Sequence, residues 1–144
     1  MKHRTLSPGF ERLRLVLLLL LAPIYFLVGV GHIQHPDFFM KIVPFWVPWP
    51  RATIVATGIC ELFGAIGLLI PRTRRWAGIM LGLYAVCVFP ANIKHALDHV
   101  AYGTPPGWWY HGPRLLAQPL IVWWALFAGR VTDWPFGRAI SRSA

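Results

Sequence analysis

Long apolar runs separated by short polar or proline-rich segments are the dominant pattern along this chain. They occupy residues 13–34, 51–70, 76–97 and 115–130. The first three have about the 20 residues that an α-helix needs to cross a hydrocarbon core of about 30 Å. Within lipid, backbone groups must be paired inside the spanning structure, so consecutive runs of this kind predict helices rather than strands. The pattern predicts an all-α integral membrane four-helix bundle.

The same pattern divides the chain into one membrane domain with a tail at each end. We expect a basic tail over residues 1–12, the transmembrane domain over 13–130 and a second tail over 131–144. Composition supports a membrane class, because 56% of the residues are hydrophobic and only 13% are charged. A soluble domain usually carries about 25% charged residues.

The net charge of +9 does not indicate a nucleic-acid partner, because the basic residues lie at the ends of apolar runs rather than along one face. They predict contacts with membrane lipids. Most of them fall on one predicted side: Lys2, Arg4, Arg12, Arg14, Arg72, Arg74, Arg75, Arg130, Arg138 and Arg142. The others are Lys41, Arg51, Lys94 and Arg114. Cytoplasmic segments carry an excess of Lys and Arg, so we expect both termini and the 71–75 loop to be cytoplasmic, in the cell (inner) membrane.

The two predicted outer loops, 35–50 and 98–114, are rich in aromatic residues and proline. One interpretation is an aromatic belt at the membrane interface with proline-stiffened turns. The alternative is that the loops fold over the bundle as a lid on an outward-facing cavity. The sequence alone leaves both interpretations open.

Glu61 is the most informative polar residue, because it lies near the middle of the second apolar run. A carboxyl group at that depth is costly unless it is protonated, paired or hydrated, and such residues commonly mark functional sites. Its helical neighbours Gly58, Gly64, Ala65 and Leu68 form a face of mainly small residues. That face suits the interior of a bundle.

The other three runs also carry polar residues toward their predicted outer ends. Asn92, His95 and His99 are spaced three and four residues apart, so they share one stripe of a helix. His32 and Gln118 occupy similar depths on the first and fourth runs. These groups form either an inter-helix hydrogen-bond network or a functional pocket.

A metal site is not predicted. His95 and His99 have the spacing of two ligands on one helical face, and His32, His35 and His111 are further candidates. However, the histidines are scattered and no cysteine ligand accompanies them. Cys60 and Cys87 are expected to be buried free thiols.

Four segments resemble the DoxX-like family of small membrane proteins. They are Phe38–Pro50 (FFMKIVPFWVPWP), Thr57–Leu69 (TGICELFGAIGLL), Val88–His95 (VFPANIKH) and Leu115–Trp124 (LLAQPLIVWW). The resemblance implies a four-helix membrane bundle associated with redox biology, since the family's namesakes are linked to a thiosulfate:quinone oxidoreductase. It also implies that the family's recurrent polar positions fall at Glu61, Asn92 and Gln118. The absence of a paired-cysteine motif argues against thiol–disulfide exchange.

Three functions are compatible with these observations. The first is a redox-associated membrane subunit that binds a quinone-like or other apolar ligand and works with a partner membrane or redox protein. In it Glu61 and His95 handle protons, while His32, Asn92, His99 and Gln118 bind the ligand. The second is a lipid-modifying isomerase or hydrolase with Glu61 as acid or base. The third is a non-catalytic accessory or anchor subunit. The small-residue pair Gly78 and Gly82 fits packing within the bundle or a homo-oligomer equally well.

Overall fold

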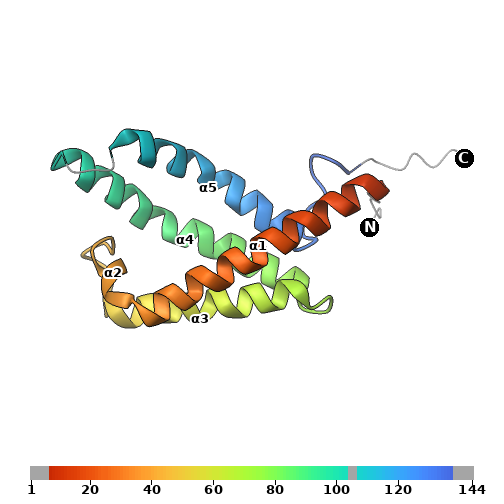
Figure 1. Cartoon of the computed structure of the whole chain (residues 1–144), viewed down its shortest axis with the longest axis horizontal. Helices are drawn as coiled ribbons and strands as arrows, with labels where there is room; N and C mark the ends of the chain where they lie inside the picture. The colour runs from red at the N-terminus through yellow and green to blue at the C-terminus, as the bar shows by residue number, and fades with distance from the viewer. Residues whose placement is uncertain (1–6, 104–106, 138–144) are drawn as a thin grey trace, which may run out of the picture.

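The computed structural model describes residues 7–103 and 107–137, which form helices and contain no strand. The helices are α1 (Pro8–Gln34), α2 (Pro36–Met40), α3 (Pro50–Leu69), α4 (Arg74–Ala101) and α5 (Trp108–Ala128). Except for the short α2, they run up and down alongside one another (Figure 1). The predicted all-α class is therefore confirmed for the described residues.

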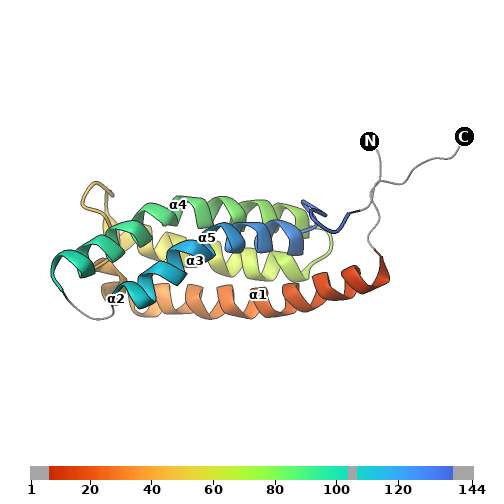
Figure 2. The same ribbon diagram turned by 90° about the horizontal axis from the view of Figure 1, so that it is seen from above.

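The two ends of the bundle differ in shape. The terminal end holds the start of α1, the end of α5 and the turn between α3 and α4, whereas the loop end holds α2, residues 41–49, the end of α4 and the start of α5 (Figures 1 and 2). At the loop end, α1 lies with α3 and α4 lies with α5, and the two pairs stand apart (Figure 1). They come together toward the terminal end.

Three of the described helices are long and apolar enough to cross a membrane: α1, α3 and α4. Helix α5 is not among them, and it carries the polar residues His111, Arg114 and Gln118. Large apolar side chains such as Leu27, Phe63 and Leu83 are exposed on the outside of the bundle. An exterior of this kind is unusual in a soluble monomer.

Several helix boundaries differ from the sequence prediction. Helix α2 lies within the predicted loop 35–50, and α4 continues to Ala101 instead of ending at residue 97. Helix α1 begins at Pro8 instead of residue 13, with proline in its first turn, where a missing N–H costs nothing. Helix α5 begins at Trp108 instead of residue 115 and continues through Pro113 and Pro119. The proposed tail 1–12 is thus helical from Pro8, while residues 1–6 lie outside the described part.

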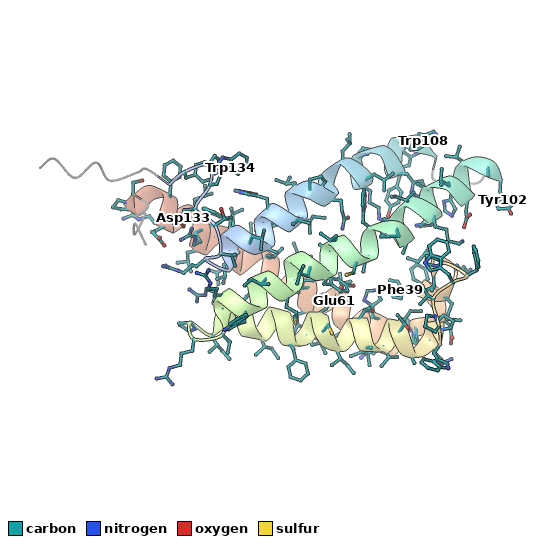
Figure 3. All side chains as sticks on the ribbon, turned by 180° about the vertical axis from the view of Figure 1, so that it is seen from behind. Phe39, Glu61, Tyr102, Trp108, Asp133 and Trp134 are labelled. Carbon is teal, nitrogen blue, oxygen red and sulfur yellow. The ribbon has the colours of Figure 1, made fainter. Side chains whose placement is uncertain are left out.

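The second proposed tail is also partly structured, because residues 131–137 pack against the bundle. Phe136 stacks on Phe10 with ring centroids 4.5 Å apart, and the Trp123 indole donates a hydrogen bond to the Trp134 carbonyl. Asp133 and Trp134 lie at the terminal end, far from Tyr102 and Trp108 at the loop end (Figure 3). Residues 138–144 lie outside the described part.

Arg14 joins this segment to α1 from inside the protein. Its guanidinium donates hydrogen bonds to Glu11, to the Thr132 carbonyl and to Asp133, and it lies over the Phe127 ring. Only 4% of the residue is exposed. Its position in a basic N-terminal stretch suggested a lipid contact, but the structure gives it an internal, structural role.

Small residues close the terminal end. A Cβ atom on Gly78 would lie 2.6 Å from the Gly129 Cα atom and 2.8 Å from the Ala125 carbonyl oxygen. Since these are backbone atoms, α4 and α5 approach this closely only because both positions are glycine. Gly78 therefore packs within the bundle.

The two cysteines correct another expectation. Cys60 and Cys87 are free thiols, as predicted, but both are exposed rather than buried. Cys87 is exposed to the cavity described below, which it lines.

Candidate functional site

A cavity of about 640 Å³ opens between the two helix pairs in the half of the bundle toward the loop end. Helices α1, α3, α4 and α5 all contribute to its wall, and so do Phe39 of α2 and the residues 42–44, 46 and 47 that follow it. Most lining side chains are apolar or aromatic. The first aromatic loop therefore forms part of the cavity wall, while among the described residues of the second predicted loop only Arg114 lines it.

His32 and Glu61 form a close pair in the wall made by α1 and α3. Nδ1 of His32 lies 2.5 Å from a carboxyl oxygen of Glu61, and Glu61 is 2% exposed. Figure 3 shows Glu61 midway along the bundle, with Phe39 on its loop-end side. The His32 nitrogen and the Glu61 oxygen share one hydrogen bond, in which either the imidazole or the carboxyl group is the donor. A buried carboxyl group with such a partner avoids the cost of an unpaired charge and can exchange a proton with a bound molecule.

Two glycines set the geometry of this pair. A Cβ on Gly29 would lie 3.1 Å from the Glu61 Cβ, and a Cβ on Gly58 would lie 2.9 Å from the His32 Cβ. Each polar residue thus sits opposite the glycine of the other helix. Each added Cβ would also lie 2.8 Å from the carbonyl oxygen of the opposite glycine. The short contact between His32 and Glu61 therefore depends on the close approach of the two backbones.

The wall made by α4 and α5 carries a second polar group. Asn92 donates a hydrogen bond to the Gln118 amide oxygen, and Gln118 donates one to the Ala85 carbonyl at 2.5 Å. Arg114 donates to the Asn92 amide oxygen at 2.6 Å. Asn92, Arg114 and Gln118 all line the cavity. They provide hydrogen-bond donors and a fixed positive charge opposite the His32–Glu61 pair.

The structure separates the remaining predicted residues from this cavity. His95 accepts a hydrogen bond from Arg114 at Nδ1, and its ring packs against those of His99 and His111. Neither His95 nor His99 lines the cavity. The predicted set therefore divides into His32, Glu61, Asn92 and Gln118, which share the cavity, and His95 with His99, which lie outside it.

Sequence reasoning missed Arg114, Tyr25 and Tyr84 as members of the site. Arg114 was interpreted as a charge marking the outer side, since it precedes an apolar run. The two tyrosines line the cavity with their rings at 6.2 Å in an edge-on arrangement. A usable signal existed for Tyr25, which lies seven residues before His32 and hence on the same helix face.

Comparison with known proteins supplies a family but no function. No curated protein and no solved structure matches the chain, so the resemblance to DoxX-like proteins stays a prediction. A family model described as a domain of unknown function (DUF8561) matches residues 21–129. The match covers most of the chain and includes every residue of the cavity and of the histidine cluster named above. The chain therefore belongs to the DUF8561 family.

Proposed function

We propose that this protein is a multi-pass membrane protein of the cell (inner) membrane, with α1, α3, α4 and α5 as its spans. In this arrangement both termini and the turn between α3 and α4 are cytoplasmic. Three helices that meet the requirements of a membrane span support the proposal, as does the apolar exterior. Helix α5 packs along α4 and returns the chain to the terminal end (Figure 2).

Cysteine labelling tests this topology. Single cysteines at Pro44, Thr73 and Gly107 would be introduced into a Cys60→Ala, Cys87→Ala background and treated with a membrane-impermeant maleimide on intact cells. We expect labelling at positions 44 and 107 and none at 73 until the cells are opened. Labelling of position 73 but not of 107 from outside would reverse the orientation.

We further propose that the cavity binds a quinone-like ligand, and that the protein serves as a membrane subunit associated with redox chemistry. The observation that carries this proposal is one apolar cavity with hydrogen-bonding groups on opposite walls. A quinone ring is apolar on its faces and carries two carbonyl oxygens at opposite edges. Donors from Asn92 and Arg114 on one wall and the His32–Glu61 proton on the other match that chemistry.

Proton handling in this proposal rests on Glu61 with His32. Reduction of a quinone to a quinol takes two electrons and two protons. Two electrons would come from a partner redox protein. The His32–Glu61 pair would deliver one proton to the nearer carbonyl oxygen, and water entering the cavity would supply the second proton to the other carbonyl oxygen. His95, which the sequence paired with Glu61 in this role, contacts Arg114 instead.

Binding of decylubiquinone to the purified protein in mild detergent tests the ligand class. Trp46 and Trp124 line the cavity, so a bound quinone should quench tryptophan fluorescence. Glu61→Gln keeps the shape but removes the acid, and we expect it to weaken binding by at least about tenfold. Glu11→Gln, at the terminal end, is the matched control and should bind as the unaltered protein does. Equal affinity of both variants, or no quenching at all, would refute the proposal.

A lipid-modifying enzyme is the second candidate, because a buried carboxyl group hydrogen-bonded to an imidazole is also a suitable acid–base pair. Mass spectrometry of the lipids that co-purify, followed by incubation of those lipids with fresh protein, separates the two functions. Chemical conversion that is lost in Glu61→Gln would favour the enzyme. Unchanged recovery of a quinone would favour the redox subunit.

A further inference from the structure

Three histidines converge outside the cavity, near the loop end of α4 and α5. His95 and His99 lie one turn apart on α4, and His111 lies in the first turns of α5. One ring nitrogen from each of the three lies within 4.8 Å of the others. The rings meet edge to face, with centroids 4.4 to 5.0 Å apart.

The separation of the closest two nitrogens is informative. Nε2 of His111 lies 3.2 Å from Nδ1 of His99. Two imidazole nitrogens bound to one tetrahedral zinc ion, each at about 2.0–2.1 Å, are about 3.3 Å apart. The pair therefore already has the spacing of two ligands. His95 and His99 are only partly buried, so their side chains have room to close the third side.

The hydrogen bonding of His111 is incomplete without a further partner. The residue is 0% exposed, and its Nδ1 has no hydrogen-bond partner in the described residues. In either tautomer, direct contact with His99 satisfies only one of its two ring nitrogens. An ion bound at Nε2 would take the place of the contact with His99, and Nδ1 would then carry the proton of the neutral imidazole.

We propose that His95, His99 and His111 form a binding site for a divalent transition-metal ion, with zinc as the reference ion. Three imidazole ligands suit zinc, copper or nickel, and they leave a coordination position open for water or another small ligand. The three ligands lie outside the cavity lining, so the site can bind an ion whether or not the cavity binds a quinone. The histidine spacing alone did not predict it, because the third ligand comes from a different helix.

Arg114 competes with the metal for His95. Its guanidinium donates a hydrogen bond to His95 Nδ1 at 2.9 Å, and arginine can only donate. A neutral imidazole has a single nitrogen with a free lone pair, so His95 accepts either from Arg114 or binds the metal. Metal binding therefore releases Arg114 from His95, and the adjacent positive charge also opposes the ion.

This competition links the metal site to the cavity. Arg114 also donates to Asn92 and lines the cavity wall. When the metal occupies His95, Arg114 is free to turn toward the cavity. Any change that the metal causes in ligand affinity at the cavity must then be matched by the same factor of change that the ligand causes in metal affinity.

Metal titration of the full-length protein in mild detergent tests the site, with Zn²⁺ followed by calorimetry and Co²⁺ by its visible absorption. We expect one equivalent of either ion, with the spectrum of cobalt held by nitrogen ligands. His99→Gln and His111→Gln should each weaken binding at least about tenfold. His35→Gln replaces an exposed histidine at the same end of the bundle and should leave binding unchanged.

His111→Gln alters a fully buried side chain, so helix content and melting temperature are measured for every variant, and His99→Gln carries the test if His111→Gln does not fold. Absence of stoichiometric binding to the unaltered protein, or equal loss in His35→Gln, would overturn the site. Arg114→Gln removes the competitor and should tighten Zn²⁺ binding by about tenfold. Unchanged or weaker binding in that variant would overturn the competition.

Discussion

The terminal end and the loop end of the bundle are built from the same kinds of helix but are held together differently. At the terminal end, Gly78 and Gly129 bring backbones into contact, and the side chains of Leu68 and Leu81 are fully buried. At the loop end, the two helix pairs separate around a cavity, and polar side chains face it from both walls.

The difference indicates that the two ends of the bundle have different roles. Within lipid there is little hydrophobic force to join helices, so small residues and close packing must do so. The terminal end supplies that packing between α3 and α4 and between α4 and the end of α5, whereas Gly29 and Gly58 supply it between α1 and α3 beside the cavity. The loop end is thereby free to keep open space and polar groups, which are poor means of holding helices together but suitable for binding a ligand.

The strongest test of this comparison is a large residue at the terminal end. Gly78→Leu places a side chain where a single Cβ would already collide with backbone atoms of Gly129 and Ala125. We expect the free energy of unfolding to fall by about 3 kcal/mol, seen as a lower melting temperature by circular dichroism in detergent. Gly31→Ala is the control, because its Cβ would make only ordinary contact with Phe39 at 4.0 Å. It should be neutral or stabilising by up to about 1 kcal/mol. Equal melting of the two variants would contradict the packing argument.

Removal of Arg14 should have the next largest effect. Arg14→Met keeps the apolar part of the side chain but loses the hydrogen bonds to Glu11, Asp133 and the Thr132 carbonyl. We expect a loss of about 2 kcal/mol and faster cleavage by chymotrypsin at Trp134 and Phe136. Arg12→Met replaces an exposed arginine on the same helix and should change stability by less than about 0.5 kcal/mol. If both variants resist cleavage equally, residues 131–137 do not depend on Arg14.

The smallest effect on stability is expected at the loop end. Gln118→Leu removes the hydrogen bonds to Asn92 and to the Ala85 carbonyl, and inter-helix bonds in membranes average only about 0.6 kcal/mol. The melting temperature should therefore change little, while binding of decylubiquinone weakens. A loss of stability as large as that of Gly78→Leu would mean that the polar wall helps to hold the bundle together, and the division between the two ends would fail.

Much of the fold could be predicted from the apolar runs. The length of a run and the glycine-rich face around Glu61 are properties of a single helix, so they can be recognised in the sequence alone. Such local patterns also placed Asn92 and Gln118 correctly toward one interior. The start of α5 was missed because Gly112 and Pro113 are helix-breaking residues by propensity, yet the chain continues through them as a helix. Tertiary contacts outweigh propensity there.

The partners within the site were harder to predict, because they depend on how two helices lie against each other. Periodicity puts His32 and Glu61 on interior faces but does not show that they meet. That contact depends on the register between α1 and α3, which Gly29 and Gly58 set. Likewise, the approach of His111 to His99 depends on the packing of α4 against α5, and no spacing within either helix records it.

The crossed arrangement of Gly29, His32, Gly58 and Glu61 also has a consequence for how this family varies. A larger residue at either glycine would displace the opposite polar residue as well as the backbone. A change at one of the four positions is therefore tolerated only with a compensating change at the position opposite it. Across related sequences, we expect positions 29 and 61 to vary as one pair and positions 32 and 58 as another, so that the proton-handling pair is inherited or lost together with the two glycines.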